Sequence, residues 1–355
     1  MDGKLHRKLA KRHEEGTLRS LSSFEGFADF ASNDYLGLAR DIGTITKAGT
    51  TGSRLISGNS ERLEQLERRL SVFFGSEAGL FFNSGYDANL GMLSSIPQRG
   101  DVILYDEFVH ASARDGIRLS LARAFSFKHN DVRDLERLFN KWSGKTIYVV
   151  TESLFSMGGD FCPLKEIVKV CKAHNAWMIL DEAHAGGVVG PAGKGLAVQE
   201  GVTSNRMIRL ITLGKAYGSH GAIVLCNEDF RNYLINFARS FIYTTALSAG
   251  HFEEVCQKIE SETLNARRMQ LQKVIEEFRS KVKGSLLSDS TSPIQMIACA
   301  SKQELRETEA NCIENKLHIK AIYPPTVPEG MEAIRVCLHH FNTSSEIDNV
   351  VHFLP

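Results

Sequence analysis

The chain lacks an excess of charge of either sign, and this absence excludes several classes of partner. Its 355 residues include 42 lysines and arginines and 42 aspartates and glutamates, so the formal net charge is zero. No block of like charge interrupts this balance. Because nucleic acids and anionic membranes attract basic patches, we expect neither as a partner. An anionic ligand would have to be held by a local site.

Cysteine pairs and long hydrophobic runs are also missing. The seven cysteines are scattered, odd in number and never spaced as C-x-x-C, so we expect neither a disulfide framework nor a metal site. The basic stretch 1–15 has no apolar segment of the kind that signal peptides contain, and no apolar run reaches the roughly 18 residues of a membrane span. We therefore expect a cytoplasmic protein with reduced thiols.

The composition that is present suits a large folded core. Hydrophobic residues make up 43% of the chain and charged residues 24%, which is enough for one large domain and a smaller one. Strand-like and helix-like segments alternate through the middle of the chain, which predicts an α/β fold with a parallel sheet and helices on both faces. The expected strands are 78–82, 101–104, 146–151, 176–180, 209–213 and 222–226. The expected helices between them are 87–94, 111–121 and 164–174.

The two ends of the chain differ from this pattern. The charged stretch 5–18 predicts a short helix, and the spacing of leucines predicts a helix over 60–74 with Ser60 as its N-cap. Long charged helices are expected over 253–280, before a smaller α/β region. The predicted divisions are an N-terminal arm, a large domain, and connecting helices with a small domain, over residues 1–30, 31–235 and 236–355.

The strongest chemical signal is Lys215, which lies in a glycine-rich turn directly after an apolar strand. Ligands of parallel sheets bind at the carboxyl ends of the strands. A lysine held there can form an imine with a carbonyl cofactor if its surroundings keep the amine neutral. Taken alone, a lysine in such a turn is more often a solvated surface residue.

A second strand, 176–180, is followed by Asp181-Glu-Ala-His184. In a pyridoxal 5'-phosphate (PLP) site, a buried aspartate pairs with the pyridine nitrogen and keeps it protonated, and His184 would lie near the phenolic oxygen. The same four letters occur in a helicase box, which also needs a phosphate loop G-x-x-x-x-G-K-[ST]. The sequence contains no such loop.

The turn Asn83-Ser-Gly85-Tyr86 joins an expected strand to an expected helix. Backbone N–H groups at a helix N-terminus bind phosphate, and a glycine allows close approach. The same turn occurs in every strand-to-helix unit, so it is weak evidence by itself. Further hydroxyl donors of the kind that bind phosphate are offered by Thr212, Thr244 and Thr245.

Two more strand ends carry polar residues. His110 follows the strand 101–104 and could stack on a flat cofactor, although a histidine in this place is more often an ordinary hydrogen-bonded residue. Glu152 and Ser156 follow the apolar stretch 147–150, where loop capping is the alternative interpretation. Together the four strand ends offer an amine, a carboxylate, histidines and a phosphate cradle, which predicts a PLP site.

These segments, in this order, resemble the α-oxoamine synthases, a family of fold-type I PLP enzymes. The resemblance runs from about Ala31 to Ile347 and is carried by residues 32–37, 52–60, 110–112, 156–160, 181–184, 212–215, 239–245 and 323–328. It implies a large domain with a mostly parallel central sheet flanked by helices, plus a smaller C-terminal α/β domain. It also implies PLP as the cofactor.

The resemblance assigns roles to residues. Lys215 would form the Schiff base and later move protons, Asp181 would pair with the pyridine nitrogen, and His110 would stack on the ring. The other residues expected to bind the cofactor are Gly85, Tyr86, Glu152, Ser156, His184, Thr212, Thr244 and Thr245. In this family the last two reach the phosphate of the neighbouring subunit, which implies a homodimer with shared active sites. The expected substrate-binding residues are Asn33, Thr326 and Arg335, the last as a grip on the amino-acid carboxylate.

The implied reaction is the condensation of an amino acid with an acyl thioester, with loss of carbon dioxide. L-alanine and pimeloyl-CoA, or a pimeloyl carrier protein, are the favoured substrates. The alternatives are family members that use glycine or serine, and a non-catalytic partner subunit. Retention of Lys215 argues against the last, because a scaffold has no need of an imine-forming amine.

The sequence also departs from the family's pattern. The stretch between Leu38 and Gly52 is shorter than usual, and Leu63 stands where a histidine is common. Ser248-Ala249 replaces the usual prolines, and Gly158 replaces the usual aspartate of Ser-Met-Asp-Gly-Asp. None of these changes removes a predicted catalytic group.

Overall fold

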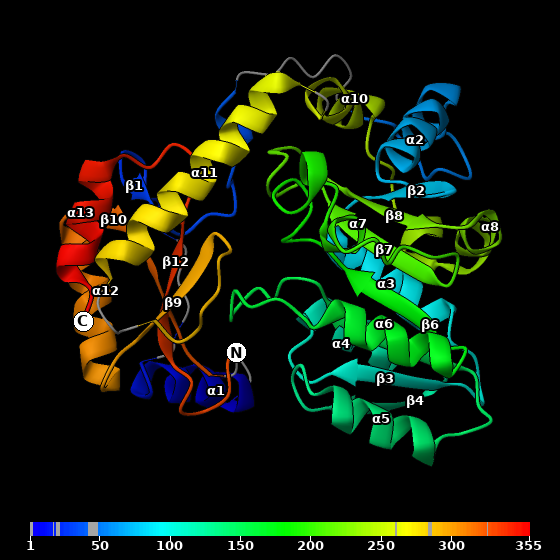
Figure 1. Cartoon of the computed structure of the whole chain (residues 1–355), viewed down its shortest axis with the longest axis horizontal. Helices are drawn as coiled ribbons and strands as arrows, with labels where there is room; N and C mark the ends of the chain where they lie inside the picture. The colour runs from blue at the N-terminus through cyan, green and yellow to red at the C-terminus, as the bar shows by residue number, and fades with distance from the viewer. Residues whose placement is uncertain are drawn as a thin grey trace.

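The computed structural model describes residues 3–16, 18, 22–41, 49–259, 261–282, 286–324 and 326–355. Its larger body surrounds a seven-stranded sheet and its smaller body surrounds a three-stranded sheet (Figure 1). Helix α11 (Glu262–Lys281) leads from the larger body to the smaller one and runs along the smaller one. Among the described helices, none combines the length and apolar content that crossing a membrane requires.

The large sheet has the strand order β2-β8-β7-β6-β5-β3-β4. Its strands are β2 (Ala78–Phe82), β3 (Val102–Asp106), β4 (Arg123–Phe127), β5 (Ile147–Glu152), β6 (Trp177–Asp181), β7 (Met207–Thr212) and β8 (Ala222–Cys226). Strands β3 to β7 pair in parallel, whereas β8 is antiparallel to both of its neighbours. The sheet is therefore mostly parallel, as predicted, and the carboxyl ends of β5, β6 and β7 share one edge.

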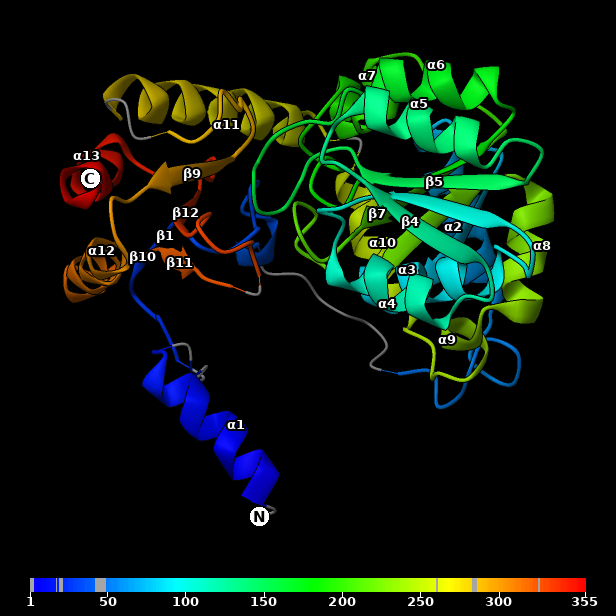
Figure 2. The same cartoon turned by 90° about the horizontal axis from the view of Figure 1, so that it is seen from below.

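Helices cover both faces of this sheet (Figure 2). The face with α3 (Gly85–Ser95) and α4 (Ala111–Leu119) is packed separately from the face with α5 (Val132–Lys141) and α6 (Leu164–Ala173). The remaining helices of this body are α2 (Glu61–Phe73), α7 (Leu196–Gln199), α8 (Glu228–Phe237), α9 (Arg239–Ile242), α10 (Ala249–Lys258) and the 3-10 turn η2 (Pro191–Gly193). Because both faces are covered, the central strands β5 and β7 are buried along their whole length.

The smaller body is built from an early segment of the chain and from its C-terminal part. Its antiparallel sheet has the order β11 (Lys320–Ile322), β12 (Ala333–Cys337), β9 (Ile294–Ala298), with α12 (Lys302–Glu314) and α13 (Ser344–Phe353) beside it. The short strand β1 (Ala28–Asp29) pairs in parallel with β10 (Leu317–His318), and the 3-10 turn η1 (Leu38–Arg40) follows. An early segment of the chain therefore packs on its C-terminal part.

Most expected elements are present, with differences that have local causes. Ser60 caps α2 as predicted, because its hydroxyl accepts the backbone N–H of Leu63 at 3.2 Å. The helix expected over 5–18 is α1 (Gly3–Glu14), and Gly16 just beyond it has φ +65°. Strand β4 and helix α5 were not expected. Strand β4 lies at the sheet edge and shows no continuous apolar run.

A buried ion cluster ties the loop before α2 to the sheet. Glu67, 2% exposed, accepts from Arg54 Nη1 at 2.7 Å and from Arg231 Nη2 at 3.1 Å. The same carboxylate accepts the backbone N–H of Phe81 in β2 at 2.9 Å. One carboxylate thus pairs with two guanidinium groups and receives bonds from three separate parts of the chain.

Replacing Glu67 with glutamine tests this cluster. The amide leaves two guanidinium groups without their shared anion, so we expect the free energy of unfolding to fall by about 3 kcal/mol in urea denaturation. The control is Glu15→Gln, which removes an exposed partner 3.6 Å from Lys11. It should change stability by less than about 0.5 kcal/mol. Equal stability of the two variants would contradict the role of the cluster.

Candidate active site

The predicted lysine lies at the shared edge of β6 and β7. Lys215 follows β7, and its Nζ is 2.8 Å from Nε2 of His184, which follows β6. Nδ1 of His184 lies 2.9 Å from the hydroxyl of Tyr35, and that hydroxyl donates to Asn33 Oδ1 at 3.0 Å. A continuous chain of polar contacts therefore runs from the amine to the early segment of the protein.

The proton positions in this chain follow from counting donors. The single hydroxyl proton of Tyr35 goes to Asn33, so Nδ1 of His184 donates to Tyr35 and its Nε2 accepts from Lys215. Burial and the adjacent lysine lower the pKa of His184 well below its usual value, which keeps the ring neutral. Burial also lowers the pKa of Lys215, although Asp181 and Glu152 oppose that shift. A lysine with a lowered pKa is available as a nucleophile.

Asp181 is held rigidly at the end of β6. Its Oδ1 accepts the backbone N–H of Ala183 at 2.9 Å, and its Oδ2 accepts from Asn89 Nδ2 at 2.8 Å. Asn89 is only 2% exposed and also donates to the Ser112 hydroxyl at 3.0 Å. The carboxylate is thus fixed on both oxygens, and Asn89 is a residue of the site that was not predicted.

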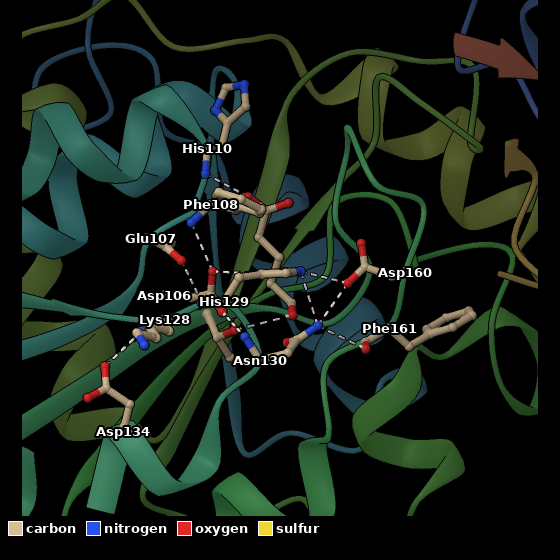
Figure 3. A network of polar contacts seen from close by, with 12 residues as sticks. Asp106, Glu107, Phe108, His110, Lys128, His129, Asn130, Asp134, Asp160 and Phe161 are labelled. Atoms are coloured by element: carbon tan, nitrogen blue, oxygen red, sulfur yellow. Dashed lines mark hydrogen bonds and ion pairs between the residues drawn. The ribbon is translucent and has the colours of Figure 1, made fainter. Parts of the chain in front are cut away.

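His110 and Glu152 are joined through the backbone. His110 caps α4, and its N–H donates to Glu152 Oε1 at 2.6 Å. Nδ1 of His110 is 2.7 Å from the Ser112 hydroxyl, and in Figure 3 the ring points away from His129. Burial, with the charge of Asp181, raises the pKa of Glu152 to about 8. At neutral pH this carboxyl is therefore mainly protonated.

The predicted phosphate cradle lies at the start of α3. A Cβ atom on Gly85 would come within 2.6 Å of Thr212 Cγ2, so the end of β7 passes directly against the helix N-terminus. The Thr212 hydroxyl donates to Ala183 O at 3.1 Å. Tyr86 is exposed, and its hydroxyl donates to Asp115 Oδ2 at 2.5 Å.

The segment with Thr244 and Thr245 lies beside the same turn. Asn83 Nδ2 donates to the Thr244 hydroxyl at 3.1 Å and to the Thr245 carbonyl at 2.7 Å. These contacts are within one chain. They place both threonines next to the loop that begins α3.

Arg335 brings the smaller body to the site. It is 7% exposed in β12, and its Nε donates to the Ser156 carbonyl at 2.8 Å while Nη2 donates to Asn33 Oδ1 at 3.1 Å. Among the described residues, no carboxylate forms an ion pair with it. A buried cation without an anion suits a carboxylate ligand. Thr326, in contrast, is exposed, and its N–H donates to Tyr323 O at 3.0 Å.

This donor set fits the predicted cofactor. A lysine with a lowered pKa, a fixed carboxylate and a helix N-terminus without room for a Cβ match an aldehyde, a ring nitrogen and a phosphate. The site residues could therefore hold PLP.

Comparison with known proteins gives the family. Residues 25–354 match the model of aminotransferase class I and II. The chain belongs to this family. Its curated relatives include an 8-amino-7-oxononanoate synthase of Emericella nidulans, 37% identical over 98% of this chain and 93% of that protein. The predicted family is thereby confirmed.

Solved structures agree with the fold. The 8-amino-7-oxononanoate synthase of Francisella tularensis has a TM-score of 0.79 at 30% identity, covering 93% of this chain and 97% of that chain. Serine palmitoyltransferase from S. paucimobilis with bound PLP has a TM-score of 0.88 at 24% identity, covering 99% of this chain and 96% of that chain. The predicted fold-type I architecture is confirmed.

Substitution of Gly85 by alanine tests the cradle. The added methyl would force Thr212 and the start of α3 apart, since the two atoms would be 2.6 Å apart. Overpacking of this size costs about 1–3 kcal/mol, so we expect PLP to bind at least about tenfold more weakly in a fluorescence titration.

Gly49→Ala is the matched control, because a Cβ at Gly49 meets nothing within 4 Å. This variant should bind PLP as the unaltered protein does. Unchanged PLP affinity in Gly85→Ala would show that the turn does not contact the phosphate.

Proposed function

We propose that this protein condenses L-alanine with a pimeloyl thioester, on CoA or a carrier protein, to give 8-amino-7-oxononanoate and carbon dioxide. The observation that carries the proposal is the contact of Lys215 with neutral His184 beside Asp181, in a chain whose curated relatives are 8-amino-7-oxononanoate synthases. When bound, PLP supplies an aldehyde for the amine and a ring that takes up the electrons of a carbanion.

Lys215 is proposed to hold the cofactor and then to move the α-proton of the amino acid at Nζ. Its lowered pKa suits both tasks, because only the neutral amine can attack a carbonyl or accept a proton. His184 Nε2 stays within 2.8 Å of this amine and accepts its N–H, which keeps the amine in position. Tyr35 supports His184 from the opposite side.

Asp181 is proposed to face the ring nitrogen of the cofactor and keep it protonated. The N–H of Ala183 and the amide of Asn89 each donate to one oxygen of this carboxylate, and together they fix its direction. His110 would stack on one face of the cofactor ring and exclude water from that face. Its place beside Glu152 is set by the backbone hydrogen bond between them.

The remaining roles follow the same geometry. Arg335 would bind the carboxylate of the amino acid, supported by its lack of an ion pair within the described chain. The residues proposed to bind the phosphate are Gly85, Tyr86 and Thr212. Ser156 and His184 are proposed to lie near the phenolic side, and Glu152 is proposed as a further cofactor-binding residue. Asn33 and Thr326 are proposed to line the substrate pocket.

We also propose a homodimer in which Thr244 and Thr245 reach the partner's phosphate. The loop near these residues exposes the large apolar side chains of Leu55 and Ile56. Backbone bonding between Ala246 N and Gly52 O, at 3.0 Å, ties this loop to the threonine segment. Exposed apolar side chains of this kind suit a subunit interface.

The division into an arm of residues 1–30, a large domain of 31–235 and a small domain with connecting helices of 236–355 is proposed on the sequence pattern. We further propose a cytoplasmic location. The seven cysteines are all free thiols, which suits a reducing compartment.

A second candidate is a synthase that uses serine. It is favoured by the TM-score of 0.88 to serine palmitoyltransferase, a likeness of fold. The identity of 37% to an 8-amino-7-oxononanoate synthase favours alanine.

The Lys215→Ala variant tests the anchoring amine. Without Nζ the visible absorbance of lysine-bound PLP should be lost, and borohydride should fix no cofactor to the protein. Product formation should fall by at least about a thousandfold, since both the attachment and the proton transfer are removed. Lys194→Ala is the control, because its amine lies over the Phe73 ring, 4.9 Å from the centroid, and is not part of the site. Retained borohydride labelling in Lys215→Ala would exclude the proposed anchor.

The choice between alanine and serine is tested by spectral titration. The PLP-bound protein is titrated with L-alanine, glycine and L-serine, and product is assayed with pimeloyl-CoA and with a pimeloyl carrier protein. We expect alanine to perturb the visible absorbance at the lowest concentration and to give product with at least one thioester. A response to serine or glycine without one to alanine would overturn the assignment.

A further inference from the structure

His129 lies between two carboxylates outside the proposed cofactor contacts (Figure 3). Its Nδ1 is 2.9 Å from Asp106 Oδ1, and its Nε2 is 2.8 Å from Asp160 Oδ2. A neutral imidazole has one N–H and one acceptor nitrogen, so it can satisfy only one carboxylate. The geometry therefore suits the imidazolium, which donates to both.

The surroundings of His129 favour this charge. Burial opposes it, but the hydrogen bonds and charges of Asp106 and Asp160 raise the pKa of His129 to about 9. The ring stacks on Phe108 at 4.5 Å and meets the edge of Phe155 at 4.5 Å. Glu107 accepts the backbone N–H of His129 at 2.9 Å.

The neighbouring residues add further links. Asn130 donates from its backbone N–H to Asp106 Oδ2 and from Nδ2 to Asp160 Oδ2, both at 2.8 Å. The backbone N–H of Lys128 donates to Asp134 on α5 at 3.0 Å. The two carboxylates therefore receive donors from His129 and from Asn130.

Asp160 lies in a tight loop, residues 153–162, that follows β5. Its carbonyl accepts the N–H of Phe155 at 3.0 Å, and Cys162 N donates to Ser153 O at 3.2 Å. The same loop carries Ser156, whose carbonyl accepts from Arg335 Nε at 2.8 Å. The His129 cluster thus anchors the loop that contacts the proposed substrate-binding arginine.

The loop also contacts the smaller body at its tip. Gly159 has φ +67°, and its carbonyl accepts from Ser292 at 2.8 Å. A Cβ atom on Gly158 would come within 2.0 Å of Asp160 Oδ1. Gly158 stands where the family usually has an aspartate, so in this chain the missing side chain gives the Asp160 carboxylate its room.

We propose that His129 is a positioning residue for the amino-acid substrate. By bridging Asp106 and Asp160 it holds loop 153–162 in the conformation in which the Ser156 carbonyl directs the Arg335 guanidinium. This inference rests on the proposed function, because it assumes that Arg335 binds the amino-acid carboxylate.

The test is the His129→Gln variant of the PLP-bound protein, since glutamine cannot donate to both carboxylates as the imidazolium does. We expect the Kd for L-alanine, from the change in visible absorbance, to rise about tenfold, which corresponds to about 1.4 kcal/mol. The KM for alanine should rise with it, while the KM for the pimeloyl thioester and the spectrum without amino acid stay unchanged. His352→Gln, an exposed histidine on α13, is the matched control and should leave all of these values unaltered.

The pH dependence gives a readout that a purely structural role would not move. The folded pKa of His129 is about 9 against an ordinary value of 6.5, so the bridge contributes its full stabilisation below about pH 6.5 and is lost as pH rises through about 9. The ratio of the alanine Kd in His129→Gln to that in the unaltered protein should therefore fall toward one above pH 9. Without cofactor, the difference in Tm between His129→Gln and the unaltered protein should shrink over the same pH range.

Gly158→Ala provides a second variant that keeps His129 intact. Its methyl displaces Asp160, so it should weaken alanine binding in the same way. This variant tests the proposal even if His129→Gln fails to fold. Unchanged alanine binding in a folded His129→Gln or in Gly158→Ala, with alanine binding normally to the unaltered protein, would overturn the role of His129. Absence of an alanine response in the unaltered protein would instead overturn the proposed function, and the positioning role with it.

Discussion

The burial of a lysine amine beside two carboxyl groups is the constraint around which the rest of the site is arranged. Asp181 and Glu152 would each favour a charged Lys215, whereas burial disfavours it. The conflict is reduced because Glu152 has a pKa of about 8 and is mainly protonated at neutral pH. Asp181 is held on both of its oxygens, by hydrogen bonds from Asn89 and from the N–H of Ala183. One carboxyl group is thus mainly protonated and the other is fixed by hydrogen bonds, while burial lowers the pKa of the amine beside them.

The site is complete only where the two bodies meet. The large sheet supplies Lys215 and His184 at one edge, while β12 of the smaller body supplies Arg335. Tyr35 links the two, because its carbonyl accepts from His340 N at 2.9 Å in the smaller body and its hydroxyl contacts His184 in the larger one. A change in how the bodies pack would therefore alter the position of Arg335 and the environment of the Lys215 amine together.

The positions of most strands and the residues at their ends were predictable, because buried parallel strands have continuous apolar sequences and their ligands lie at one edge. Lys215 and His184 were predicted separately and lie 2.8 Å apart. Asn89 was not predicted, since the sequence around an asparagine on a helix does not show that its side chain faces a carboxylate on a distant strand. Its position four residues after Gly85 is the one available signal. Thr326 was expected in the pocket from resemblance alone, and its described hydrogen bond is to Tyr323.

The loop 153–162 shows why a charged anchor suits this position. The loop touches both bodies, and at its base the buried side chains of Leu154, Phe155 and Cys162 are joined by a polar attachment. His129 provides this attachment with two hydrogen bonds to carboxylates, each of which also accepts from Asn130. A partly buried cation between two anions is destabilised by the loss of one partner. That property gives the loop a single conformation, and a single conformation is what a bidentate grip on a small carboxylate requires.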